Sequence, residues 1–226
     1  MLQLLLDIYR GAIILYRMAD STQNRRIDAV IFDIGGVLVR IDMSAALEAV
    51  RTFSPAAVAG IMKLESDPVL LEFECGRITE RDFHRHVEAL VGVEFPFDRF
   101  RACWNSIFQG EIEPTLALLE GLRRTDLKIG ILSNTNHTHF EWLRARIAAF
   151  EQLEHVYASH QIGLRKPDRA AYDYVLKQMN VPPARAVFID DLAVNLDGAR
   201  EAGMQVIHAT GPESVRAGLA ALLGSA

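Results

Sequence analysis

Asp33 is the residue of this sequence best placed to act as a nucleophile. It directly follows an apolar run at residues 29–32, and the glycine pair Gly35 and Gly36 comes next. Glycines let the backbone turn tightly and leave room for a phosphate to approach. A carboxylate in this place can attack phosphorus, because an aspartyl-phosphate intermediate divides one difficult hydrolysis into two easier displacements. An aspartate that only caps a turn is the structural alternative.

Two adjacent carboxylates, Asp190 and Asp191, follow a second apolar run at residues 186–189. An anionic nucleophile that attacks an anionic phosphate needs positive charge, and a hard cation such as Mg²⁺ held by carboxylates and water supplies it. The pair could instead mark the entry to a helix, but burying two like charges without a cation is costly. We therefore expect a magnesium site that includes these carboxylates.

Hydrogen-bond donors for a phosphoryl group are expected at two further places. Ser133 ends a third apolar run and offers a hydroxyl, and the N–H groups of Asn134 and Thr135 lie at the expected start of a helix. Lys166 adds a point charge, although a lysine before a proline can also be a solvated residue ahead of a helix. Negative charge spreads over the phosphoryl oxygens in the transition state, so donors should surround them.

Short buried strands are the elements that must bring these residues together. Apolar runs are found at residues 29–32, 129–132, 155–159, 186–189 and 204–208, and helical stretches separate them. About five such strands alternating with helices predict an α/β fold with a doubly wound parallel sheet. Ligands of such sheets bind beyond the carboxyl ends of the strands, and the candidate residues fall at those ends.

Prolines and glycines mark several of the expected helices. Prolines in the pairs Ser54-Pro55, Glu113-Pro114 and Lys166-Pro167 suit a first helical turn, which tolerates a missing N–H. In the third of these helices we expect Asp168 in the first turn and an apolar face made by Tyr172, Val175, Leu176 and Met179. Another helix is expected from about Asn195 to Gly203.

Residues 42–111 show helical signals and no comparable strand signals, which predicts a helical cap domain that overhangs the site. Thr79 and Asp82 approximate a capping box within it. The core domain is then made of residues 28–41 and 112–226. Residues 1–27 are expected to be an N-terminal extension that is disordered or starts upstream of the native protein, with Met18 as the working start. Its apolar stretch is too short to span a membrane.

Composition excludes some classes of partner. The formal net charge of -5 leaves no basic face for binding nucleic acid, and no membrane partner is expected. Cys75 and Cys103 show neither a paired spacing nor a secreted disulfide framework. We expect reduced thiols, a cytoplasmic location and a small-molecule partner.

Four segments, in this order, resemble the four sequence motifs of the haloacid dehalogenase (HAD) family: residues 33–38, 132–135, 166–168 and 188–191. The resemblance implies a magnesium-dependent phosphatase that acts on a small phosphorylated metabolite, a sugar phosphate or similar. It implies that Asp33 and Lys166 are catalytic, and that Ser133, Asn134 and Lys166 bind phosphate. It also implies that Asp33, the carbonyl of Gly35, and Asp191 bind Mg²⁺, with Asp190 bound directly or through water.

Gly35 departs from the pattern of this family, whose phosphatases commonly carry a second aspartate two residues after the nucleophile as general acid and base. The glycine resembles a subgroup that includes glucose-1-phosphate phosphatases and the N-terminal phosphatase domains of epoxide hydrolases. Loss of general acid–base help, which is worth about 10²–10⁴ in rate, favours substrates with good leaving groups or a substitute such as Asp42 or Glu74.

Several other residues are interpreted as structural. His137 and His139 diverge on a helix and are expected at the surface or the rim of the site. Phe95, Phe97, Trp104 and Phe108 are expected to fill the core of the cap. Two alternatives to the phosphatase stay open: a weakly active or inactive regulatory protein of the same fold, and a 2-haloacid dehalogenase. The sequence identifies neither the substrate nor the oligomeric state.

Overall fold

A computed structural model of the chain describes residues 27–224. The expected N-terminal extension, with its proposed start at Met18, lies outside the described residues apart from Ile27. Within the part that is described, no helix has the length and apolar character needed to cross a membrane.

A five-stranded parallel sheet forms the centre of the protein, in the order β5-β4-β1-β6-β7. The doubly wound α/β fold expected from the sequence is confirmed, and the strands agree with the expected runs to within a residue or so. Their bounds are β1 Ala29–Phe32, β4 Lys128–Ser133, β5 His155–Ala158, β6 Ala186–Asp190 and β7 Gln205–His208.

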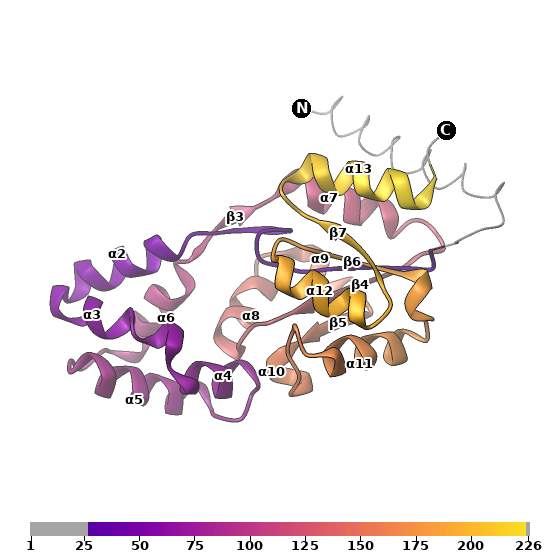
Figure 1. Cartoon of the computed structure of the whole chain (residues 1–226). Coiled ribbons are helices and arrows are strands. Elements are labelled where there is room, and N and C mark those ends of the chain that lie inside the picture. The colour runs from indigo at the N-terminus through magenta and orange to yellow at the C-terminus, as the bar shows by residue number, and fades with distance from the viewer. Residues whose placement is uncertain (1–26, 225–226) are drawn as a thin grey trace.

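Both faces of the sheet are covered, which explains why strand β1 is apolar at every position. Val30 and Phe32 belong to one core cluster with residues of α7 (Glu113–Leu122) and α13 (Pro212–Leu223). Ala29 and Ile31 belong to a second with residues of α11 (Arg169–Met179) and α12 (Ala193–Glu201). Figure 1 shows α7 and α13 on one side of the sheet and α11 on the other. Successive side chains of a strand point to opposite faces, so burial on both sides requires an unbroken apolar run.

The helices that cover the sheet start close to the expected positions, with one exception. Helix α7 begins at Glu113-Pro114, and α12 is followed by Gly203 at a φ of 90°. Helix α11, by contrast, begins at Arg169, and Asp168 is its N-cap in a non-helical conformation instead of a residue of the first turn. The bounds are α7 Glu113–Leu122, α8 His137–Arg144, α9 Ala148–Glu151, α10 Ser159–Ile162, α11 Arg169–Met179, η4 Pro183–Arg185, α12 Ala193–Glu201 and α13 Pro212–Leu223.

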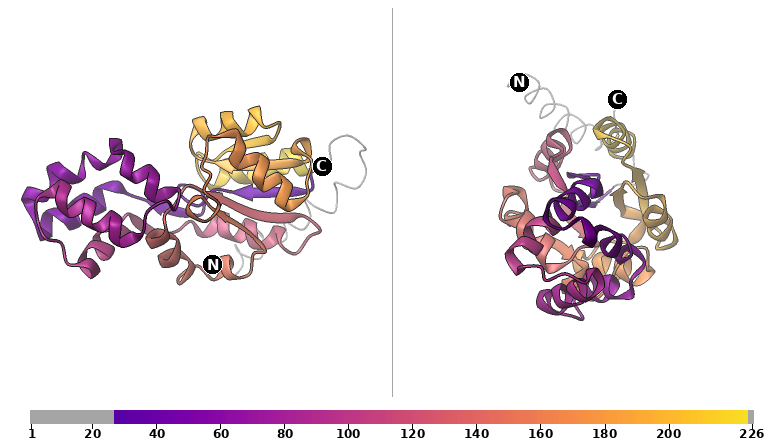
Figure 2. Two further views of the ribbon diagram at one scale, coloured as in Figure 1. Left: turned by 90° about the horizontal axis from the view of Figure 1, so that it is seen from below. Right: turned by 90° about the vertical axis from the view of Figure 1, so that its left-hand side faces the viewer.

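A second group of helices lies at one end of the sheet (Figures 1 and 2). Its members share a core cluster that includes Phe73, Phe83 and Phe95, and the expected capping box between Thr79 and Asp82 is present. We propose that this group is the cap, with the boundaries 42–111. The elements are α2 Met43–Phe53, η2 Pro55–Ala57, α3 Val58–Ile61, η3 Leu64–Ser66, α4 Pro68–Glu74, α5 Glu80–Val91 and α6 Phe97–Asn105.

Two short strands, β2 Val39–Ile41 and β3 Phe108–Glu111, form an antiparallel ribbon between the helical group and the sheet. Strand β3 lies within residues 42–111, where no strand was expected, so the expectation was wrong there. Most of its residues are exposed, and Gly110 interrupts it, so it carries neither an apolar run nor a clear alternation.

Candidate active site

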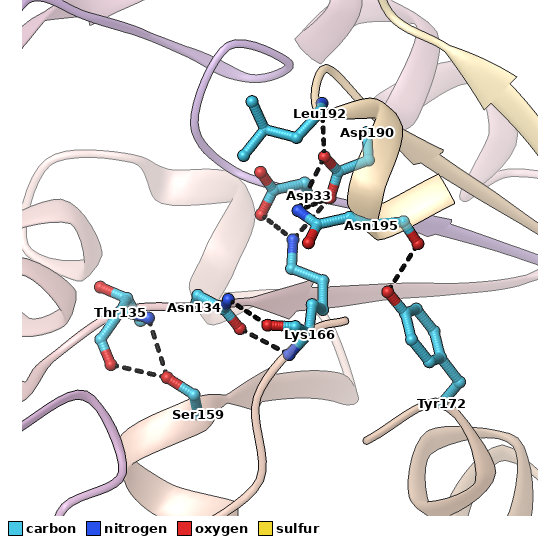
Figure 3. Close-up of polar contacts among 9 residues, drawn as sticks. All are labelled: Asp33, Asn134, Thr135, Ser159, Lys166, Tyr172, Asp190, Leu192 and Asn195. Carbon is cyan, nitrogen blue, oxygen red and sulfur yellow. Dashed lines mark hydrogen bonds and ion pairs between the residues drawn. The ribbon is translucent and has the colours of Figure 1, made fainter. Parts of the chain in front are cut away.

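The ammonium of Lys166 lies between two carboxylates at the carboxyl edge of the sheet. Its Nζ is 2.8 Å from Oδ1 of Asp33 and 2.7 Å from Oδ2 of Asp190 (Figure 3). Asp33 directly follows β1, and its N–H donates to the carbonyl of Ile189 on the neighbouring strand β6, at 2.8 Å. Lys166 and Asp190 are 1% and 0% exposed, so the group is screened from water. Three residues distant in the sequence are thus brought together as expected.

The site holds more negative than positive charge. Burial raises the pKa of Asp33 to about 6, although Lys166 opposes this effect, and the charge of Asp190 adds to it. Burial and the neighbouring Asp190 also raise the pKa of Asp191. The pKa of Lys166 is raised as well, because the attraction of two carboxylates outweighs the cost of its burial. A carboxylate whose charge is this poorly compensated favours an additional cation.

Oxygen ligands for such a cation are present. One carboxylate oxygen from each of Asp33, Asp190 and Asp191 lies within 4.8 Å of the others. Gly36, at a φ of 67°, packs against Asp191 so closely that a Cβ atom would lie 2.3 Å from its Oδ2. The position of Asp191 therefore depends on a glycine at residue 36. Hard oxygen donors are the ligands that Mg²⁺ prefers, so the residues fit this metal.

Asp190 already has partners for both of its oxygens. Oδ1 accepts from the N–H of Leu192 at 2.8 Å and from the amide of Asn195 at 3.0 Å, while Oδ2 accepts from the same amide at 3.1 Å and from Lys166. Tyr172 donates to the carbonyl of Asn195 at 2.6 Å. Direct coordination of a metal by Asp190 would have to displace these donors. The contacts favour Asp191 as the direct ligand and Asp190 as the residue that orients Lys166.

Asn195 was interpreted from the sequence only as the start of a helix, and its contact with the site was missed. It lies in the first turn of α12, five residues after Asp190, so the spacing alone offered a weak signal. Its amide is one of the groups that compensate the buried charge of Asp190.

The segment after β4 holds the lysine loop in place. The amide of Asn134 donates to the carbonyl of Lys166 and accepts from its N–H, both at 2.8 Å, while Ser133 is buried at the strand end. The N–H of Thr135 donates to the hydroxyl of Ser159 at 2.9 Å. Helix α8 begins only at His137, so the expectation that residues 134 and 135 lie at a helix start was wrong. The side chain of Asn134 is occupied, which leaves its N–H as a candidate donor to phosphate.

The helical group contacts the loops that carry these residues. Arg165, which precedes Lys166, pairs with Glu74 of α4 at 2.8 Å, and Ser159 donates to the carbonyl of Glu74 at 2.7 Å. Burial raises the pKa of Glu74. Asp42 caps helix α2 by accepting from Ser44, which lowers its pKa. Of the two proposed substitutes for the missing acid, Asp42 is therefore the less suited to hold a proton, whereas burial favours the protonated form of Glu74 and its pair with Arg165 opposes this effect.

His139 is buried, so the expectation of a surface or rim residue was wrong for it, although His137 is exposed. Its Nε2 donates to the carbonyl of Trp104 at 2.9 Å, and its ring stacks on the indole. Burial lowers the pKa of His139 to about 4, so its ring is neutral at pH 7. Phe108 stacks on Trp142 and packs against the core cluster of the sheet, not in the core of the helical group where it was expected. Phe95 fills the core of the helical group as expected.

Comparison with known proteins gives a consistent result. A model of haloacid dehalogenase-like hydrolases matches residues 27–203. D-ribitol-5-phosphate phosphatase of Bacteroides thetaiotaomicron is 26% identical over 203 residues, covering 87% of this chain and 98% of that protein. Sesquiterpene phosphatase astK of Aspergillus oryzae is 26% identical over 189 residues, covering 80% and 89%. The HAD-family enzyme BT-2542 of Bacteroides thetaiotaomicron, solved with magnesium and inorganic phosphate, has a TM-score of 0.74 at 26% identity and covers 80% and 93%.

Proposed function

The chain belongs to the haloacid dehalogenase-like hydrolase family, and we propose that it is a magnesium-dependent phosphatase that hydrolyses a small phosphomonoester through an aspartyl-phosphate intermediate. The observation that carries the proposal is the buried ammonium of Lys166 between Asp33 and Asp190, with Asp191 beside them. Two of the proteins named above, the relatives from Bacteroides thetaiotaomicron and Aspergillus oryzae that are called phosphatases, support the same reaction class.

In the proposed reaction the carboxylate of Asp33 attacks phosphorus, and the ester bond between phosphorus and the leaving oxygen breaks, so that the oxygen departs with the electron pair and takes a proton from water. Water then attacks the aspartyl-phosphate, which releases inorganic phosphate and restores the carboxylate. The Lys166 ammonium and the Ser133 hydroxyl bind phosphoryl oxygens and compensate their charge in both steps. Asp190 and the amide of Asn134 keep the ammonium and the backbone of Lys166 in position.

Asp33, Asp191 and the carbonyl of Gly35 would hold Mg²⁺. When bound, the ion supplies the positive charge that lets an anionic nucleophile approach an anionic ester. Asp190 keeps its contacts with Lys166 and Asn195 and contributes to the site through them.

Replacement of the nucleophile is the first test. Asp33→Asn keeps the size of the side chain and removes the attacking anion, so the turnover of a panel of phosphate esters should fall to background. Asp197→Asn is the matched control, since Asp197 is an exposed aspartate on α12 that pairs with Arg200. Circular dichroism checks the fold of both variants. Hydrolysis retained by folded Asp33→Asn would falsify the covalent mechanism.

Removal of the metal is the second test. Chelation should abolish hydrolysis, Mg²⁺ should restore it, and Ca²⁺ should inhibit, because its longer and looser coordination misplaces the phosphate against Asp33. Full activity after exhaustive chelation would remove the metal from the proposal. Magnesium binding without hydrolysis of any ester would support the regulatory alternative, and halide release from 2-haloacids would support the dehalogenase.

A further inference from the structure

Ile41 covers the place where a side chain at residue 35 would begin. A Cβ atom at Gly35 would lie 2.5 Å from Cδ1 and 3.6 Å from Cγ1 of Ile41. Gly35 lies between Asp33 and Gly36, and Gly36 packs against the carboxylate of Asp191. Ile41 therefore borders the acidic site, yet it remains 44% exposed. A methyl group stands where a polar side chain at residue 35 would extend.

Leu192 provides a second apolar side chain at this border. Its N–H donates to Oδ1 of Asp190, which fixes its backbone next to the Lys166 pair (Figure 3). The residue is nevertheless 53% exposed. The backbone of Leu192 is held at the site, while its large apolar side chain is open to solvent. An apolar ligand that covers this side chain lowers the free energy of the complex.

Four of the exposed large apolar residues follow segments of the site in the sequence. Scattered exposed apolar residues are common and need no explanation. Here, however, Ile41 and Met43 follow the Asp33 loop in the sequence, and Leu192 and Val194 follow the Asp190-Asp191 pair. The full set is Ile41, Met43, Phe53, Met62, Leu71, Leu192 and Val194.

We propose that Ile41 and Leu192 form an apolar wall on the leaving-group side, and that the enzyme selects phosphomonoesters of apolar alcohols, such as aryl or branched alkyl alcohols. The inference rests on the proposed phosphatase activity. The ammonium of Lys166 and the acidic group bind the charged phosphoryl end, and the apolar end packs on the wall. A polyol phosphate would instead turn hydroxyl groups toward methyl groups, where they lose hydrogen bonds to water.

A series of 4-alkylphenyl phosphates, from methyl to butyl, tests the wall, because the alkyl chain lengthens while the acidity of the leaving phenol stays nearly constant. We expect kcat/KM to rise by up to about fourfold for each methylene that becomes buried. Ribitol 5-phosphate should be a poorer substrate than any of them. Leu192→Asn and Ile41→Asn should each flatten the dependence on chain length. Met62→Asn is the control, because Met62 is 63% exposed and lies at the end of α3 in the helical group.

Each result has a separate meaning. Hydrolysis of the whole series with a flat dependence on chain length would overturn the apolar wall and leave the phosphatase intact. An unchanged dependence in a folded Leu192→Asn variant would also overturn it, even if Ile41→Asn does not fold. No hydrolysis of any ester would overturn the proposed function and the wall with it. A dependence that Leu192→Asn flattens and Met62→Asn preserves supports the proposal.

Discussion

Lys166→Met isolates the role of the buried ammonium, because methionine has a similar length and no charge. In the native protein the ammonium lies 2.8 Å from Asp33 and 2.7 Å from Asp190, and Lys166 is 1% exposed. Removing one partner of a buried ion pair typically costs about 3–5 kcal/mol. In the presence of a chelator at pH 7.5, we expect the free energy of unfolding to fall by this amount.

The dependence of this loss on pH follows from the carboxylates left behind. The pKa of Asp33 is about 6 with Lys166 present, and loss of the cation raises it further. A carboxyl group whose pKa is higher in the folded than in the unfolded state destabilises the fold at high pH. The cost shrinks as pH falls through the folded pKa toward the unfolded value, because protonation removes the buried charge. The deficit of the variant should therefore be smaller at pH 5.5 than at pH 7.5. Mg²⁺ should reduce it at pH 7.5 by binding the folded state.

Urea unfolding followed by circular dichroism measures these free energies, with Lys177→Met as the control for loss of an exposed lysine. Loss of one donor to developing charge typically lowers kcat by about 10²–10³, so the turnover of Lys166→Met should fall at least this far. A destabilisation below about 1 kcal/mol at pH 7.5, or a deficit that grows on acidification, would refute the assigned role of the ammonium.

Three further predictions concern groups around the site. The pKa of His139 is lowered from 6.5 to about 4 in the folded state, so protonation of the unfolded chain should remove roughly 3 kcal/mol of stability as pH falls from 6.5 to 4. The free energy of unfolding of His139→Phe should lack this part of the dependence on pH. The new side chain of Gly35→Asp would collide with Ile41, so the carboxylate should be accommodated in the double variant with Ile41→Ala. This double variant should flatten the plot of log kcat against leaving-group pKa, and a plot like that of the native protein would show that another residue donates the proton. Asn195→Ala leaves Asp190 short of an amide donor and should cost about 1–3 kcal/mol of stability in urea unfolding, whereas an unchanged stability would show that this amide does not compensate the buried charge of Asp190.

The central sheet and the residues at its edge could be predicted from the amino-acid sequence. Strand β1 is apolar at all of its positions because helices bury both of its faces. Such an unbroken apolar run can be recognised in the sequence without any knowledge of the tertiary structure. Parallel strands place their carboxyl ends at one edge, so Asp33, Ser133 and Asp190 were expected to meet there. The α/β fold, the family and the enzyme class are confirmed. The cap boundaries and the roles of the site residues stay proposals.

The pairing of the side chains at this edge could not be predicted, because it depends on how distant elements pack. Asp190 and Asp191 are equivalent in the sequence, but the turn into α12 directs Asn195 and the N–H of Leu192 to Asp190 and leaves Asp191 against Gly36. Such contacts depend on the packing angle of a helix against a strand.

The burial of His139 and the contact of Ile41 with Gly35 were decided in the same way. His139 contacts the carbonyl of Trp104, which lies on another element, α6. Ile41 lies against Gly35, from which a turn of the chain separates it. Local periodicity reports which face of an element is apolar, but it carries no information about the residue that the face will meet. The sequence therefore identified the groups that can do chemistry. Packing decided which group compensates the charge of another, which group orients another, and which side chain takes the space of another.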